Sequence, residues 1–162
     1  MSKNPSIERT CPECGHAMIR DSRPFTVKYK GLSTVVDMPG WYCTNCDEAV
    51  SVGKDMDVTD RALVRLKAEA EHLLQPEEVK KIRKKLALSQ VEAGELLGGG
   101  RNAFQKYETA QITTSKALTV LLRILDQEPR MLEIVRTTEG NVVVSPHSAK
   151  KSRKQRAKKL AR

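Results

Sequence analysis

The chain has 162 residues, of which 39% are hydrophobic and 30% are charged, and it carries a formal net charge of +9. This length accommodates one or two small domains and argues against a single large enzyme core. The sequence holds no run of 18 or more apolar residues and no leader in which charged residues precede apolar ones. We therefore expect a cytoplasmic protein with no membrane partner.

The positive charge is concentrated near the C-terminus. Residues 140–162 hold eight Lys or Arg residues and no acidic residue, which leaves a net charge of +1 for residues 1–139. The basic composition therefore describes a tail and says little about the folded part of the chain.

Two C-x-x-C pairs lie in the N-terminal third, with 28 residues between the inner cysteines; they consist of Cys11, Cys14, Cys43 and Cys46. Such pairs are typical of a zinc ribbon or knuckle, in which four thiolates close a tetrahedral site. Disulfide bonds are the competing interpretation, and a cytosolic location disfavours them. A thioredoxin-like redox site is also disfavoured, because no βαβ pattern surrounds either pair. His16 and His72 are interpreted as non-ligands, so the prediction is one structural Zn²⁺ per chain.

The segment between the two cysteine pairs predicts a β-hairpin. Residues 25–29 and 32–36 alternate or run apolar around Lys30-Gly31, and Trp41-Tyr42 is expected to lead a third short strand. A hairpin of this size cannot bury enough surface to fold alone, so we expect the metal to be structural and not catalytic. The nearby acids are interpreted as solvated surface residues: Asp37, Asp47, Glu48 and Asp55.

A helix capped by Thr59-Asp60 is predicted next, with apolar positions from Val58 to Leu74. Gln75-Pro76 interrupts it, and Pro76 suits the first turn of a new helix. These signals predict a zinc-binding domain over residues 1–75 and an all-α domain of five helices over residues 76–136. Residues 137–162 are rich in Ser, Lys and Arg without apolar periodicity, which predicts a disordered basic tail.

Residues 89–110 indicate two short helices joined by a tight turn. Ser89 and Glu92 form a capping box, and the glycines at positions 98–100 end the first helix, because glycine is costly inside helices and easy in turns. The second helix is expected from Arg101 to about Thr109. This arrangement describes a helix-turn-helix, with an ordinary helical hairpin as the alternative.

The outer face of the second helix favours DNA binding over the helical hairpin. Its side chains are of the types that reach base edges and phosphates: Arg101, Asn102, Gln105 and Lys106. The basic helix that begins at Pro76 can add phosphate contacts through Lys80, Lys81, Arg83, Lys84 and Lys85, although a solvated cationic face explains any one of them nearly as well. Two further helices are predicted, one capped by Ser115 and one that restarts at Pro129.

Over residues 9–136 the chain resembles the MqsA (YgiT-type) antitoxins. The resemblance rests on Cys11-Pro12-x-Cys14, Tyr42-Cys43-x-x-Cys46, Ile82-Arg83-Lys84-Lys85-Leu86, Gly98-Gly99-Gly100-x-Asn102-Ala103-Phe104-x-x-Tyr107-Glu108, Leu121-Leu122-Arg123-x-Leu125-Asp126 and Pro129. It implies an N-terminal zinc domain that neutralises a small ribonuclease toxin. It also implies a phage-repressor-like C-terminal domain that forms a homodimer and represses the operon. Asn102 matches the family's DNA-reading Asn, whereas Lys106 replaces an Arg and Arg101 replaces a Val, so the operator sequence is expected to differ.

The sequence thus predicts an α+β protein that is an antitoxin and autorepressor and not an enzyme. Its expected partners are palindromic double-stranded operator DNA, a ribonuclease toxin and a second copy of the chain. The alternative is a stand-alone zinc-containing helix-turn-helix regulator. An enzyme is disfavoured because the sequence shows no catalytic triad and no nucleotide-binding loop.

Overall fold

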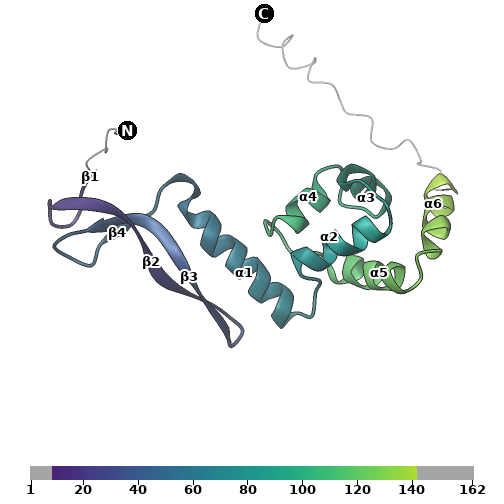
Figure 1. The fold of residues 1–162 in the computed structure, drawn as a ribbon, viewed down its shortest axis with the longest axis horizontal. Coiled ribbons are helices and arrows are strands. Elements are labelled where there is room, and N and C mark those ends of the chain that lie inside the picture. The colour runs from purple at the N-terminus through teal and green to yellow at the C-terminus, as the bar shows by residue number, and fades with distance from the viewer. Residues whose placement is uncertain (1–8, 142–162) are drawn as a thin grey trace, which may run out of the picture.

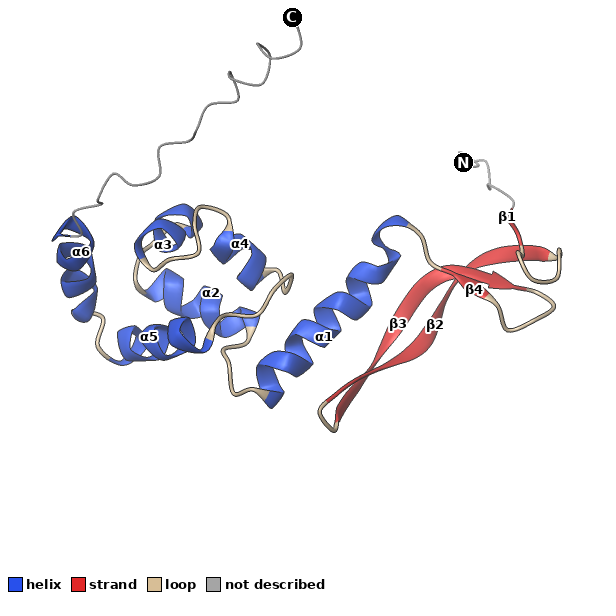
Figure 2. Ribbon diagram, turned by 180° about the vertical axis from the view of Figure 1, so that it is seen from behind, coloured by secondary structure: helices blue, strands red, loops and turns tan. Residues whose placement is uncertain are grey.

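The computed structural model describes residues 9–141 and has an α+β fold, with a four-stranded antiparallel sheet and six α-helices (Figure 1). The sheet comes first in the chain, and α1 lies between it and the five remaining helices (Figure 2). The expected α+β class is confirmed. Among the described residues, no helix combines the length and the apolar character needed to cross a membrane.

The sheet is dominated by one long hairpin. Strands β2 (Ala17–Tyr29) and β3 (Leu32–Cys43) pair continuously from Met18↔Cys43 to Tyr29↔Leu32. Lys30 and Gly31 form the turn, and their φ values of 43° and 85° are both positive, as a two-residue type I′ hairpin turn requires. The short strands β1 (Arg9–Thr10) and β4 (Ala49–Val50) add to the far end of the hairpin.

The hairpin expected over residues 25–36 is confirmed, but it is longer than expected. Trp41 and Tyr42 belong to β3 and do not start a third strand. The reason is visible in the burial pattern, because Met38, Gly40 and Tyr42 are all buried while the residues between them are more exposed. Period-two burial of this kind continues a strand through a position where the sequence suggested a break.

Helix α1 (Asp57–Ala70) covers one face of the hairpin, where Ala62 and Leu66 pack with Val27. The predicted cap at Thr59-Asp60 is wrong: the helix begins at Asp57, directly after the 3₁₀ turn η1 (Gly53–Met56), and the Thr59 hydroxyl donates to the Met56 carbonyl. The helix also ends before the predicted Leu74. His72 has a left-handed φ of 55° and Leu73 N donates to Ala68 O, which closes the helix as C-terminal capping motifs do.

Five helices follow, as predicted: α2 (Pro76–Lys85), α3 (Gln90–Leu96), α4 (Ala103–Glu108), α5 (Lys116–Gln127) and α6 (Met131–Asn141). They enclose one apolar cluster that consists of Leu74, Val79, Ile82, Leu86, Leu88, Ala93, Phe104, Leu118, Leu122, Leu125 and Leu132. Helix α6 continues to Asn141, so the prediction of disorder from residue 137 is wrong for residues 137–141. Leu132 and Val135 pack on the cluster, and the helix continues beyond Val135 through a polar stretch to Asn141. The rest of the predicted tail, residues 142–162, lies outside the described residues.

We refer below to residues 9–70 as the N-terminal unit and to residues 76–141 as the helical unit. The five residues between them are held by the burial of Leu74 in the apolar cluster and by polar contacts. The Glu71 carboxylate accepts from Tyr29 Oη at 2.6 Å and from Lys30 Nζ at 2.9 Å. Arg65 on α1 forms two hydrogen bonds to the Glu77 carboxylate on α2, at 2.5 and 2.9 Å. Gln75 Nε2 donates to Arg65 O at 3.1 Å, and Arg123 Nη2 on α5 donates to His72 O at 3.1 Å.

Candidate metal centre and nucleic-acid interface

The two cysteine pairs meet at the end of the sheet that β1 and β4 complete. The first pair lies in the loop between β1 and β2, and the second follows β3, so the pairing Met18↔Cys43 brings both loops together. The four Sγ atoms lie within 4.8 Å of one another, and all four thiols are free. The predicted set of Cys11, Cys14, Cys43 and Cys46 is therefore assembled as one cluster.

The spacing of the sulfurs fits a tetrahedral metal and not disulfide bonds. Cys14 Sγ lies 3.4 Å from Cys43 Sγ and 3.5 Å from Cys46 Sγ, and Cys11 Sγ lies 3.6 Å from Cys46 Sγ. Four Zn–S bonds of about 2.3 Å would separate sulfurs by about 3.8 Å, whereas a disulfide requires about 2.05 Å. The cluster can thus hold a metal ion, and the donor set is the one zinc prefers. His16 is exposed, and its Nδ1 hydrogen-bonds to the Cys14 carbonyl oxygen; its interpretation as a non-ligand stays a prediction.

The pKa values of two of these thiols are shifted in opposite directions. A hydrogen bond from the backbone of His16, assisted by those from the other thiols, lowers the pKa of Cys14 to about 6. The backbone of Glu48 lowers that of Cys46, but hydrogen bonds with Cys14 and Cys43 outweigh it and raise the pKa to about 12. Four thiols at contact distance cannot all ionise without a cation, so any metal that the cluster binds would promote their deprotonation.

An ion pair next to the cluster fastens η1 to the sheet. Arg20 on β2 donates to both carboxylate oxygens of Asp55, at 2.5 and 2.8 Å, and Val52 N donates to the same carboxylate. These hydrogen bonds, with that of Arg20 first, lower the pKa of Asp55 to about 2. Asp55 is buried, so its interpretation as a solvated surface acid is wrong. It positions the start of α1.

The turn between α3 and α4 has the geometry that the glycines predict. The Ser89–Glu92 capping box is confirmed: Ser89 N donates to the Glu92 carboxylate at 2.8 Å, and Glu92 N donates to Ser89 Oγ at 3.1 Å. Gly98, Gly99 and Gly100 all have positive φ values. A Cβ at Gly94 would lie 2.2 Å from Gly100 O, so the two backbones approach as closely as only glycine permits.

The four predicted DNA-reading residues lie together on an exposed surface. Gln105 and Lys106 project from α4, whereas Arg101 and Asn102 lie in the turn before it, because α4 begins at Ala103 and not at Arg101. All four are exposed, while Ala103 and Phe104 on the opposite side of the helix are buried. Arg101 has one weak ion pair, 3.6 Å from Glu95. Their side chains are thus available to a ligand that approaches this surface.

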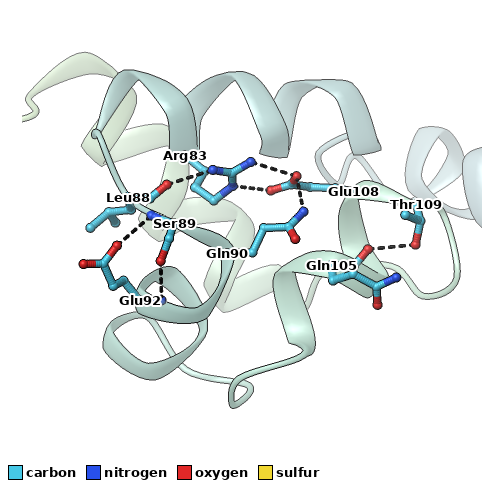
Figure 3. Close-up of polar contacts among 8 residues, drawn as sticks. All are labelled: Arg83, Leu88, Ser89, Gln90, Glu92, Gln105, Glu108 and Thr109. Atoms are coloured by element: carbon cyan, nitrogen blue, oxygen red, sulfur yellow. Dashed lines mark hydrogen bonds and ion pairs between the residues drawn. The ribbon is translucent and has the colours of Figure 1, made fainter.

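A buried polar cluster fixes α4 against α2 and α3 (Figure 3). The Glu108 carboxylate accepts from Arg83 Nε at 2.5 Å, from Arg83 Nη2 at 3.0 Å and from Gln90 Nε2 at 2.8 Å. Arg83 Nη1 also donates to Leu88 O at 2.8 Å, next to the start of α3. Burial acts to raise the pKa of Glu108, but the hydrogen bonds from Arg83 and Gln90 outweigh it and hold that pKa below its usual value. A six-residue helix is too short to persist alone, so these contacts and Phe104 orient it.

The prediction that Arg83 contacts phosphate is therefore wrong, because its side chain is only 11% exposed and is paired with Glu108. The helical spacing could have predicted that Arg83 is buried, because Arg83 falls on the same face of the helix as Val79 and Leu86. The Lys85 ammonium is also paired, because it donates a hydrogen bond to the Asp126 carboxylate on α5. Lys80, Lys81 and Lys84 remain exposed.

The N-terminal unit presents a groove between α1 and β3. It has a volume of about 470 Å³ and is lined by Ser33, Thr34, Val36, Val58, Arg61, Ala62, Arg65, Leu66 and Glu69. Strand β4 pairs with β3 only at Trp41 and Tyr42, so residues 32–40 of β3 have no strand partner on that edge within the described part of the chain. This volume is in the range of ordinary ligand sites, and an open strand edge can accept another strand.

Comparison with known proteins identifies the family. The family model described as the antitoxin component of the bacterial toxin–antitoxin system, MqsA, matches residues 9–136. The chain belongs to the MqsA antitoxin family. A curated relative, Antitoxin MqsA of Escherichia coli (strain K12), is 33% identical over 129 residues, which cover 78% of this chain and 98% of the relative. The resemblance stated from the cysteine pairs and the glycine turn is confirmed, and the matches favour an MqsA antitoxin over a stand-alone regulator.

Proposed function

We propose that this MqsA-family antitoxin binds zinc and a ribonuclease toxin through its N-terminal unit and reads operator DNA through its helical unit. It acts by binding, without catalysis, in the cytoplasm. The observation that carries the proposal is the pairing of a four-cysteine cluster with a separate exposed surface made by Arg101, Asn102, Gln105 and Lys106. Family membership supports the toxin as partner.

The metal is proposed to be one Zn²⁺ held by Cys11, Cys14, Cys43 and Cys46. Four thiolates leave no open coordination position, so the ion is structural. It would join the β1–β2 loop to the segment after β3. This unit has few buried apolar residues near that end, where Cys11, Met18 and Cys43 form the cluster.

The DNA surface suits entry into a major groove. An Asn can bond to an adenine edge, and Arg, Lys and Gln bond to guanine, adenine or phosphate. The helical unit carries eleven Lys or Arg residues against eight Asp or Glu residues over residues 76–136, so its charge also favours DNA. Lys106 offers guanine a single point charge in place of the two-pronged donor of Arg.

A homodimer is proposed to present two such surfaces to a palindrome. Helices α5 and α6 expose apolar side chains at helical spacing, with Val120 49% and Ile124 45% exposed on α5, and Ile134 57% exposed on α6. Exposed apolar residues that gather on adjacent helices are typical of an interface. Half-site centres are expected about 34–36 Å apart, or a multiple of one DNA turn. Sedimentation should show a dimer that Ile124→Lys converts to monomer, with Lys116→Gln as control.

The toxin is proposed to occupy the groove and open edge between α1 and β3, where a strand of the toxin can pair with β3. Residues 9–70 hold nine basic and nine acidic residues, so the protein part of this unit is neutral; four thiolates around one Zn²⁺ add a charge of −2. Asp47 and Glu48 remain available to a basic toxin, whereas Asp55 is buried and Asp57 is paired with Arg61 at 3.7 Å.

Co-expression with the toxin gene next to this gene tests the function. The wild-type chain should restore growth, and Arg61→Glu should not, because Arg61 lines the groove. Lys54→Glu, an exposed change outside the groove, is the matched control and should restore growth. Loss of rescue by Asn102→Ala, together with normal rescue by Arg61→Glu, would contradict the proposed division between the two units.

A further inference from the structure

Arg65 takes part both in the groove and in the contact between the two units. Its side chain lines the groove beside Leu66 and Val36, and the same guanidinium donates to both oxygens of Glu77 in the first turn of α2. Its backbone carbonyl accepts the bond from Gln75 Nε2. Arg65 therefore takes part in two of the contacts that hold the connector, and among the described residues it forms the one ion pair between the two units.

From this double position we infer that Arg65 is an exchange residue: a toxin that fills the groove takes the Arg65 guanidinium from Glu77 and thereby releases the helical unit from its fixed orientation. The inference rests on the proposed function, because it requires the groove to be the toxin site. It adds a regulatory consequence, since the unit that reads DNA would be held in one orientation only while the groove is empty.

The chemistry of the pair suits an exchange. The guanidinium presents its donors in a planar fork, and a carboxylate or a backbone carbonyl of a strand in the groove can accept from it as Glu77 does. The Arg65 side chain is 48% exposed and that of Glu77 is 65% exposed, so a competing acceptor can reach the pair. Such exposed pairs shift an equilibrium by a factor of about five or less, which a protein partner can readily overcome.

The other contacts hold the connector without pairing one unit directly with the other: Leu74 packs in the apolar cluster of the helical unit, and the Glu71 carboxylate accepts from Tyr29 and Lys30 of the hairpin. Arg123 Nη2 donates to His72 O through one bond, and both residues are exposed. Arg61 provides a contrast, because it lines the same groove but pairs only within α1, 3.7 Å from Asp57. Arg61 thus lines the groove without contacting the helical unit, whereas Arg65 lines the groove and also pairs with Glu77 of that unit. Variants of the two residues can therefore distinguish an effect on the groove from an effect on the connector.

The test uses the full-length zinc-loaded chain with spin labels on non-thiol side chains at positions 54 and 84, one on each unit, so that the cysteines stay intact. In the wild type without toxin the distance distribution should be narrow, and Glu77→Gln should broaden it. Arg61→Gln should leave it narrow. Addition of an inactive form of the toxin encoded beside this gene should broaden the wild-type distribution to the width seen for Glu77→Gln.

Toxin affinity supplies the second readout. Glu77→Gln should bind the toxin about two- to fivefold more tightly, because Glu77 no longer competes for Arg65. If the toxin binds the wild type but Glu77→Gln changes neither the distribution nor the affinity, the exchange is wrong and the proposed function stands. If the toxin does not bind the wild type at all, both are wrong.

Discussion

The N-terminal unit and the helical unit are of similar length but are stabilised by different physics. In the helical unit ten buried residues form one apolar cluster, which Leu74 of the connector joins. The N-terminal unit has two smaller apolar clusters of three buried residues each, Cys11, Met18 and Cys43 at one end and Val27, Ala62 and Leu66 at the other. A hairpin and one helix cannot enclose a core, so we expect the first unit to depend on a metal held by its four cysteines, whereas the second depends on burial.

The largest test of this contrast is metal removal. Chelation, or Cys43→Ser, should unfold the sheet while α2–α6 persist, because structural zinc contributes about 10–16 kcal/mol of apparent binding energy in small zinc domains. Metal analysis of the native chain should give about one zinc per chain. Hydrogen exchange should accelerate over residues 17–43 and stay unchanged over residues 76–127. Equal acceleration in both ranges would show that the units are not independent.

The next largest effect should come from the buried pair in the helical unit. Arg83→Met leaves the Glu108 charge without its partner, and loss of one member of a buried pair costs about 3–5 kcal/mol. The double variant Arg83→Met with Glu108→Leu should recover much of that loss. Denaturant unfolding of the helical transition measures both, with the exposed Lys84→Met as control. A single variant as stable as the control would contradict the account of how α4 is held.

The two units should unfold at different pH values when the protein is acidified. Metal ligands must be deprotonated, so the N-terminal unit should lose metal as the pH falls. Glu108 has a folded pKa below its ordinary value of 4.5, so its contribution is present above pH 4.5 and disappears as the pH falls through the lower folded pKa. The helical unit should therefore unfold at a lower pH than the N-terminal unit. Circular dichroism together with metal release, followed on one sample, measures the two midpoints.

The smallest effect concerns recognition alone. Asn102→Ala should weaken operator binding by about 1–3 kcal/mol and relax preference at one base position, without a change in stability. Binding to a set of operators with single base changes measures this, and Gln127→Ala, on α5, serves as control. Wild-type affinity of Asn102→Ala would show that another surface reads the DNA.

The sequence predicted the parts that depend on local chemistry. The capping box at Ser89, the cap at Ser115, the glycine turn and the four-cysteine cluster follow from the preferences of the residues involved, and the structure confirms each of them. The residues proposed to read DNA are exposed, but α4 starts two residues later than expected, because sequence defines the ends of short helices poorly.

The parts that the sequence did not predict depend on contacts between distant residues. The sequence alone suggests that Asp55 is a surface acid, because its partner Arg20 lies 35 positions away in the chain. The sequence alone likewise suggests that Arg83 belongs to an exposed basic face, because it does not show that Glu108 lies against α2. Charged residues are buried only when their partners are brought to them, and pairing across 25 or 35 positions is set by the fold and not by local preference.

The central claim is that each unit contacts a different partner, and hydrogen exchange of the full chain with each partner in turn tests it most directly. Operator DNA should slow exchange over residues 98–108 and leave residues 32–40 and 58–69 unchanged. The toxin encoded beside this gene should slow exchange over residues 32–40 and 58–69 and should not protect residues 98–108. Protection of residues 98–108 by the toxin alone, or of the β3 edge by DNA, would contradict the account.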